Sequence, residues 1–431
     1  MAKLLKRKWR PTNTSGLPRR DRQGCEYEAY VPDPLSGRGV TLDGQTAADI
    51  ADAEAALARL NREGRALIDS EAIGRLLLRA EAVASSKIEG LEVGARRLLR
   101  AEQAQRLGEP PKDITATEVL NNIEAMTWAI ENLGGAQAIT PADILAVHRR
   151  LLAGTHLQQH AGTIRNQQNW IGGSDYNPCT AAYVPPPHEH VQELLEDLCR
   201  FCNSDELPPI AQAAIAHAQF ETIHPFVDGN GRTGRALIHV VLRRRGLAPR
   251  VQPPISLVLA TWSSDYIDAL TGTRYRGTPQ SRSAHEGLDR WIALFATATR
   301  RAVENAETYE QRVRELQDAW RERIGRIRAG SATELLIDAL PGTPIVRVQS
   351  GAALIGRSRQ AVNEAIPRLT HAGVLKQITI GRRNRAFEAA ELIDAFTDLE
   401  RQLASPDGDT RFSKPTRGVP RRRRAGRSSG G

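Results

Sequence analysis

The chain has 431 residues, which is enough to bury one large core or two to three domains of ordinary size. Its composition, 40% hydrophobic and 25% charged, is ordinary for a soluble globular protein. The longest apolar runs are far below the ~20 residues that a membrane-spanning helix needs, and no apolar segment follows the basic N-terminus. We therefore predict no membrane span, no secretory signal and a cytoplasmic location.

The net charge of +9 is concentrated at the two ends of the chain. Residues 1–23 carry +7 and residues 411–431 carry +8, so the body between them is mildly acidic at −6. Basic tails bind phosphate backbones or anionic surfaces without sequence preference, but they also aid solubility. Composition leaves both interpretations open.

The four cysteines do not suggest a disulfide framework in a chain of this length. Cys199 and Cys202 form a C-x-x-C, but this motif lies in a segment of helical periodicity, and no second pair stands at zinc-binding spacing. We predict two reduced helix cysteines with no redox or metal role.

The first third of the chain is predicted to be helical behind an extended arm. Residues 1–45 are rich in Pro, Gly and Arg and are expected to lie over a domain surface. Apolar residues three and four positions apart predict an N-terminal helical region over 46–110, with Ser70 as a helix N-cap. Thr140 and Pro141 should then form the N-cap and first position of a further helix.

A second helical domain is predicted over residues 111–300. Its helical pattern stops between residues 153 and 186, where a Gly-Gly turn and a proline run predict a short β-hairpin or flap. Helices resume over 209–223 and from Gly231 to Arg244. The highly charged segment 301–330 is predicted to be a rigid helical connector.

The C-terminal part has a different pattern. Residues 331–404 show a helix, a helix–turn–helix and a two-stranded wing in that order, which predicts a winged helix. Residues 405–431 are rich in Pro, Gly and Arg and are predicted to be disordered. The predicted fold class is therefore mainly α, with a small β-hairpin flap and a C-terminal winged helix-turn-helix domain.

One loop between two predicted helices carries most of the chemistry: His224-Pro225-Phe226-Val227-Asp228-Gly229-Asn230-Gly231-Arg232-Thr233-Gly234-Arg235. The first N–H groups of the second helix lack intrahelical partners and form a ready anion site. Gly229 and Gly231 let the backbone approach a ligand closely. Asp228 is a carboxylate of the kind that Mg²⁺ accepts alongside phosphate oxygens, and Arg232 and Arg235 suit phosphates.

His224 ends the first helix, where its neutral form can take a proton near pH 7. A base, a metal ligand, an anion site and two arginines within twelve residues predict phosphoryl-group chemistry. An EF-hand is excluded because its bidentate acid would fall on His239, and a P-loop is excluded because its motif is missing. A purely structural turn would not need two arginines and a histidine together.

The loop resembles the Fic family signature H-x-F-x-[DE]-G-N-G-R-x-x-R at every fixed position. The similarity extends over roughly residues 40–330, including the flap and the region of Tyr266 and Trp291. The resemblance implies a nucleotidyltransferase that moves AMP from ATP to a hydroxyl side chain of a target protein, with Mg²⁺ as cofactor. It leaves the target, the modified residue type and the preference for adenine open.

The resemblance also implies roles for individual residues. His224 would deprotonate the attacking hydroxyl, Asp228 would hold Mg²⁺, and Phe226 would anchor the loop in the core. The flap, about residues 169–183, would align the target by strand addition. Tyr266 is assigned to the adenine side, although a helix residue at the edge of the core is an alternative. The implied ATP-binding residues are Glu89, His224, Gly229, Asn230, Gly231, Arg232, Thr233, Gly234, Arg235 and Tyr266.

A second motif, Ser85-Ser86-Lys87-Ile88-Glu89-Gly90, fits the inhibitory pattern [ST]-x-x-x-E-[GN] of Fic proteins with their own inhibitory helix. Its position N-terminal to the loop resembles the second class of the family. Glu89 could pair with Arg235 and keep that arginine from the γ-phosphate of ATP, with Ser85 as part of the motif. An ordinary helix-terminal acid before a capping glycine is the alternative.

Two further functions remain open. The same site could remove AMP, with Glu89 positioning a water. The chain could also be a DNA-binding regulator that uses its Fic domain as a sensor, through residues 331–404 and the basic tails. The basic residues behind that hypothesis are Arg357, Arg359, Arg382, Arg383 and Arg385. A homodimer and self-modification are also possible within the resemblance.

Overall fold

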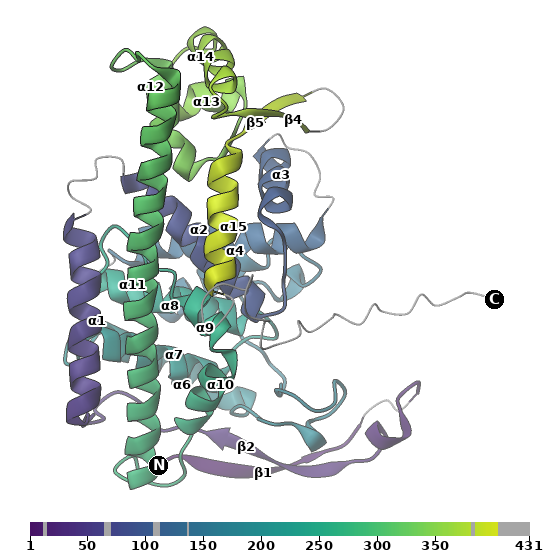
Figure 1. The fold of residues 1–431 in the computed structure, drawn as a ribbon. Helices are drawn as coiled ribbons and strands as arrows, with labels where there is room; N and C mark the ends of the chain where they lie inside the picture. Colours follow the sequence, from purple (N-terminus) through teal and green to yellow (C-terminus); the bar gives the residue numbers. More distant parts are fainter. Residues whose placement is uncertain (12–14, 64–69, 107–112, 136–137, 381–383, 404–431) are drawn as a thin grey trace.

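The computed structural model describes residues 1–11, 15–63, 70–106, 113–135, 138–380 and 384–403. These residues are mainly helical, as the sequence predicts, with short strands near both ends of the chain (Figure 1). The helices of the body are α1 (Gly44–Glu63), α2 (Ser70–Ile88), α3 (Ala95–Arg106), α4 (Ile114–Leu133), α5 (Pro141–Leu151), α6 (Val191–Asn203), α7 (Pro209–Ile223), α8 (Asn230–Arg244), α9 (Ile255–Thr261), α10 (Ser263–Gly272) and α11 (Arg282–Ile324).

Helices α7 and α8 form the centre of the body, and the glycine-rich loop joins them. Helix α7 is buried along almost its whole length, because its many alanines let α6, α8 and α11 pack closely around it. Phe220 at its end and Phe226 in the loop are fully buried. The end of α7 and the middle of the loop are therefore both held in the core.

The predicted cap before α5 is present. Thr140 and Asp143 form a reciprocal capping box, and Pro141 occupies the first turn. The predicted connector over 301–330 is mainly the second half of α11, which begins at Arg282 and runs for 43 residues. Because its apolar side continues from the body, with Trp320 fully buried, this segment packs in the core and is not a free spacer.

The N-terminal arm is extended, but it folds back on itself as a hairpin. Strand β1 (Lys3–Trp9) pairs antiparallel with β2 (Cys25–Val31), with Lys3 opposite Val31 and Trp9 opposite Cys25. The hairpin is fastened to the body at one end, where Tyr30 Oη donates to the Tyr275 carbonyl at 2.8 Å. Figure 1 shows the two strands running side by side along one end of the molecule.

A disulfide joins this hairpin to the flap, which the sequence did not predict. Cys25 of β2 is bonded to Cys179, 154 positions further along the chain. No spacing pattern in the sequence indicates this pair, because the hairpin and the flap meet only in the folded chain. Cys199 and Cys202 are free and buried in α6, and burial raises the pKa of the Cys199 thiol to about 12.

The C-terminal part follows the predicted order of elements. Helix α12 (Ala332–Ala339) is followed by β3 (Ile345–Val346), α13 (Val348–Ile355), α14 (Arg359–His371), β4 (Lys376–Ile380), β5 (Asn384–Glu388) and α15 (Ala390–Leu403). The strand order is β3-β5-β4, and both pairs are antiparallel. The predicted wing turn at 381–383 and the predicted disordered tail lie outside the described residues, so the winged helix and the tail stay predictions.

Removing the disulfide should loosen the flap without unfolding the helical body. A native disulfide contributes about 2–4 kcal/mol to the free energy of unfolding, mainly by restricting the unfolded chain. This one also links the N-terminal hairpin to the flap, which has a single β-bridge of its own. In a Cys25→Ser variant, amide hydrogen exchange of residues 169–183 should rise by about tenfold or more, while that of α7 and α8 should stay the same. Cys199→Ala, which removes a free buried thiol, is the control. Unchanged exchange in the flap would contradict this prediction.

Candidate active site

The loop after α7 turns on an uncommon backbone conformation. His224 has φ of 49° and ψ of 60°, and among the described residues it is the one non-glycine residue with positive φ. Such a left-handed conformation is unfavourable for a residue with a side chain and persists where the surroundings impose it. Gly229, with φ of 78°, makes the second reversal just before α8. These two left-handed residues let the chain leave α7, pass through the loop and enter α8.

Arg165 holds this loop in place. It is 3% exposed, and its guanidinium donates to the carbonyls of His224 at 2.9 Å, Gln167 at 3.0 Å and Pro186 at 2.6 Å. Its backbone N–H donates to the Pro225 carbonyl at 3.0 Å. A buried arginine of this kind is satisfied only when carbonyls are placed around it, so it links the loop to the start and end of the flap.

Asn230 also works within the loop. Its Oδ1 accepts from the Phe226 N–H at 2.8 Å, and its Nδ2 donates to the Phe226 carbonyl at 2.9 Å. The sequence predicts that this side chain stabilises charge on phosphates. In the structure the amide fixes the loop, because its acceptor and one of its N–H donors match the N–H and the carbonyl of Phe226.

His224 is half-buried, and its environment differs from the predicted one. Burial, together with the positive charges of Arg165 and Arg274, lowers the pKa of His224 to about 3. The sequence predicts a neutral histidine that can take a proton near pH 7; the enclosed site holds its pKa well below that value, and its role as a base stays a prediction. The ring is neutral at physiological pH, and its buried Nδ1 has no hydrogen-bond partner among the described residues.

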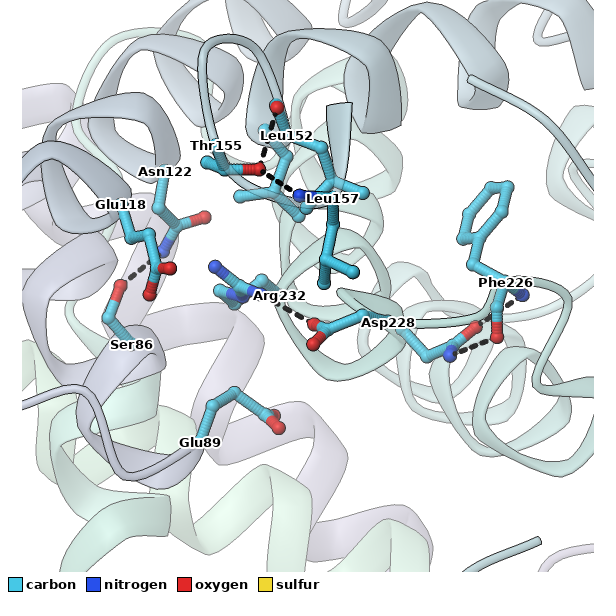
Figure 2. Close-up of polar contacts among 12 residues, drawn as sticks. Ser86, Glu89, Glu118, Asn122, Leu152, Thr155, Leu157, Phe226, Asp228 and Arg232 are labelled. Carbon is cyan, nitrogen blue, oxygen red and sulfur yellow. Dashed lines mark hydrogen bonds and ion pairs between the residues drawn. The ribbon is translucent and has the colours of Figure 1, made fainter. Parts of the chain in front are cut away.

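Asp228 and Arg232 form an ion pair at the start of α8 (Figure 2). Arg232 Nη2 lies 2.8 Å from Asp228 Oδ1. The Asp228 side chain is 47% exposed, so it can accept a further ligand. Arg232 is buried, and within the described part of the chain its Nε and Nη1 have no hydrogen-bond partner. A desolvated guanidinium with unmet donors favours an anion in the adjoining space.

Arg235 is buried and contacts the motif of residues 85–90. It is 1% exposed, its Nε donates to Ser85 Oγ at 2.9 Å, and its Nη2 donates to Glu89 Oε1 at 2.7 Å and to the Ser85 carbonyl at 2.8 Å. The two side chains that the sequence pairs are therefore in contact. Glu89 follows the last residue of α2, and its own side chain is 37% exposed.

The Glu89 carboxylate also lies against the first turn of α8. A Cβ placed on Gly231 would lie 2.0 Å from Glu89 Oε1, so a larger residue there would require the Glu89 carboxylate to move away. The N-terminal turn of a helix attracts anions through its free N–H groups and its dipole. The carboxylate therefore stands at the place where the sequence predicts a phosphate.

The other residues that are predicted to bind ATP lie further inside the protein. Tyr266 is 4% exposed on α10, its hydroxyl is 2.7 Å from His217 Nε2, and its ring packs on Trp291. This placement is that of the alternative, a core residue, and the adenine contact stays a prediction. Thr233 is buried in α8, and Gly234 faces the side chains of α7.

The flap is held by fewer backbone pairs than predicted. In place of a β-hairpin, a single antiparallel bridge joins Ile171 and Tyr183, with a short 3-10 turn at Pro178–Thr180 between them. Prolines remove backbone donors, so strand pairing does not extend here. Side chains replace it: Tyr183 Oη donates to the Thr222 carbonyl at 2.7 Å, and Trp9 of the hairpin packs on Trp170.

Three residues at this site have no role predicted from the sequence: Arg165, His148 and Glu221. His148 is a polar residue on the buried side of α5, among Ile144, Val147 and Leu151, which was a readable signal. Glu221 precedes the loop, and burial raises its pKa to about 7. Arg165 offered no signal, because an arginine in a loop most often lies in solvent.

Within the described ranges, no group of three or more His, Cys, Asp or Glu side chains could hold a metal, and no helix has the length and apolarity to cross a membrane. Two buried arginines, the half-exposed carboxylate of Asp228 and a helix N-terminus lie together in this helical protein, and their chemistry suits a polyanion.

Comparison with known proteins names the class. Residues 138–242 match the model of the Fic/DOC family, and residues 47–131 match the model of the Fic/DOC family N-terminal region. Over these residues the chain is similar to the Fic/DOC family. The loop and α8 fall in the first match, and α1, α2 and α4 fall in the second.

Curated relatives match over part of their length. One is protein adenylyltransferase fic-1 of Caenorhabditis elegans, 38% identical over 26% of this chain and 20% of that protein. Another is protein adenylyltransferase Fic of Drosophila ananassae, 35% identical over 32% of this chain and 26% of that protein. The chain thus spans about a fifth to a quarter of these two relatives. A Fic family protein from Desulfovibrio desulfuricans G20 has a similar fold, with a TM-score of 0.51 and 19% identity over 83% of this chain and 98% of that one.

Two fully buried histidines predict a loss of stability in mild acid. Burial lowers the pKa of His148 to about 4 and that of His217 to about 3. Below about pH 6.5 the unfolded chain binds a proton at each histidine while the folded chain does not, so the free energy of unfolding falls as the pH falls. Each histidine contributes a slope of about 1.4 kcal/mol per pH unit between pH 6.5 and its folded pKa.

Urea unfolding between pH 7 and pH 5 measures this slope. His148→Gln should reduce it by about the contribution of one histidine, about 1.4 kcal/mol per pH unit, whereas replacement of the exposed His188 should not. Equal slopes for the wild type and His148→Gln would show that His148 does not stay neutral in the folded chain.

Proposed function

We propose that the chain is a protein adenylyltransferase that transfers AMP from ATP to a hydroxyl of a target protein and is held inactive by Glu89. The observation that carries this proposal is the contact of Glu89 with both Arg235 and the first turn of α8. The names of the relatives support the reaction, and the loop supports the site. The helical body with its Fic/DOC match supports the fold for that chemistry.

The residues present fit ATP with Mg²⁺. The unmet donors of buried Arg232 and the N–H groups of α8 would receive phosphate oxygens, and the half-exposed Asp228 would hold the metal. Mg²⁺ would neutralise charge on the phosphates. One protein carboxylate is enough for such a site, since Mg²⁺ keeps waters and takes its other ligands from the nucleotide.

His224 would accept the proton of the attacking hydroxyl. Its ring is already neutral, which a base requires, but its low pKa makes it a weak base in the absence of nucleotide. Phosphates bound nearby would add negative charge and raise that pKa toward neutrality. The base would therefore become effective when the nucleotide is in place, and positioning would supply most of the remaining rate enhancement.

The brake would act through competition for one anion site. Glu89 places a carboxylate where a phosphate would gain from Arg235 and from the helix dipole. Two anions cannot share this desolvated place without a partner for the second charge. ATP would then bind without its outer phosphate on Arg235, and the α-phosphate would not face His224.

Replacing Glu89 should activate the protein. Glu89→Gly frees Arg235 and should raise self-modification and target modification by about 10- to 100-fold, which corresponds to about 1.4–2.7 kcal/mol in the barrier. Adding His224→Ala to Glu89→Gly should abolish the product. AMP incorporation is measured by intact mass after incubation with ATP and Mg²⁺. Glu92→Gly, at an exposed glutamate three positions on, is the control, and equal rates for wild type and Glu89→Gly would remove the brake.

Removal of AMP is a second proposal for the same site, with Glu89 positioning a water. The two activities separate in one experiment, in which an AMP-modified target is incubated with wild-type protein and Mg²⁺ but no ATP. Release of AMP that is lost in Glu89→Gly would favour removal. A stable modification under these conditions favours transfer.

We also propose that the C-terminal elements form a winged helix that contacts DNA. The order α12-β3-α13-α14-β4-β5 supports this, and so do exposed arginines at the start of α14 and on β5. Deleting the whole segment is a poor test, because α15 packs against α11. Arg359→Glu with Arg385→Glu should reduce duplex binding and lower its salt dependence, while Arg282→Glu at the far end of α11 should not. Equal binding by all variants would exclude this surface.

A further inference from the structure

His148 contacts the loop at Phe226 and Asp228, whereas Glu89 lies against Gly231. It lies on α5, is fully buried, and its ring stacks on Phe226 with centroids 3.7 Å apart and planes 3° from parallel. Phe226 is in the middle of the loop that carries His224 and Asp228. The imidazole is therefore packed directly under the part of the loop that the proposed reaction uses.

The hydrogen bonds of His148 fix its tautomer. The backbone N–H of Gly162 donates to Nδ1 at 3.0 Å, so Nδ1 carries no proton. A carbonyl oxygen accepts hydrogen bonds and cannot donate them, so the ring nitrogen that faces the Asp228 carbonyl, Nε2, carries the proton. Nε2 lies 2.9 Å from the Asp228 carbonyl and therefore donates to it.

This donor holds the backbone at the point where α8 begins. The Asp228 carbonyl is bound to His148, while the Asp228 side chain projects toward Arg232 and solvent (Figure 2). The next residue, Gly229, is in contact with the same ring: a Cβ there would lie 3.4 Å from His148 Cδ2 and 2.8 Å from Leu151 Cδ2. The backbone of 228–229 is thus fixed against α5, and this fixes the direction of the carboxylate and of the first N–H groups of α8.

We propose that His148 is a positioning residue for the transfer reaction, and that its Nε2–H orients Asp228 and the N-terminus of α8 toward the phosphates. This inference rests on the proposed function, because it assigns His148 a role in that site. His148 itself contacts neither nucleotide nor target. Its counterpart is Glu89, which occupies the anion site from α2, whereas His148 keeps that site in shape from α5.

Three substitutions at His148 separate the effects of its hydrogen-bond donor, its hydrogen-bond acceptor and its ring stacking. His148→Gln can place an amide donor near the position of Nε2, whereas His148→Asn is too short to reach Asp228 but keeps an acceptor near Nδ1. His148→Phe keeps a ring over Phe226 and removes both hydrogen bonds. Each substitution is made in the Glu89→Gly background. The control is His239→Gln, at a buried histidine of α8.

The first readout is amide hydrogen exchange of residues 226–231 without ATP or Mg²⁺. We expect His148→Asn and His148→Phe to speed exchange in this segment by about tenfold or more and His148→Gln to keep it near the control. Equal exchange in all three variants would overturn the proposal. So would faster exchange spread evenly over α7 and α8, because it would indicate a role in general stability.

The second readout is the dependence of AMP transfer on Mg²⁺. His148→Asn and His148→Phe should raise the Mg²⁺ concentration at half-maximal rate by about 10-fold and leave the KM for the target within about twofold, and His148→Gln should restore the wild-type requirement. A loss in kcat alone, with an unchanged Mg²⁺ requirement, would contradict positioning of Asp228. If the Glu89→Gly parent transfers no AMP, the proposed function fails, and the exchange experiment still decides whether His148 holds the loop.

Discussion

A buried arginine that must have a carboxylate or a phosphate beside it explains much of this structure. Arg235 is 1% exposed, and a guanidinium in such a place is stable only with charge and hydrogen bonds around it. Ser85 and Glu89 supply these from α2. The same Glu89 carboxylate lies against Gly231 in the first turn of α8, so the partner of Arg235 also covers the helix N-terminus.

The need of Arg235 for an anionic partner would link the proposed inhibition by Glu89 to the proposed reaction. An arginine with no partner would destabilise the fold, so the brake and the substrate would act as alternative partners of one group, each stabilising the protein when bound. The loop meanwhile is kept in one conformation by groups that do not exchange partners. These are Arg165 on its carbonyls, Asn230 on Phe226, and His148 on Asp228. A rigid loop beside one arginine whose anionic partner can change suits a site that is switched when a phosphate displaces Glu89.

Local patterns predicted much of the fold and the centre of the site. Helix periodicity and the Thr140-Pro141 cap place α5, and the loop residues meet Glu89 as the paired motifs predict. What the sequence could not show depends on tertiary contact. Cys25 and Cys179 are 154 positions apart, Arg165 resembles any loop arginine, and the low pKa of His224 comes from burial beside guanidinium groups of other segments. Asn230 fits a phosphate ligand by type, but two backbone groups of Phe226 use its amide.

The central claim is that Glu89 and the outer phosphate of ATP compete for Arg235. A crystal structure of the wild-type protein with Mg²⁺ and a non-hydrolysable ATP analogue tests it most directly. The account predicts that Arg235 keeps its contact with Glu89 and that the γ-phosphate lies elsewhere. A γ-phosphate bound to Arg235 while Glu89 remains on the same guanidinium would contradict it.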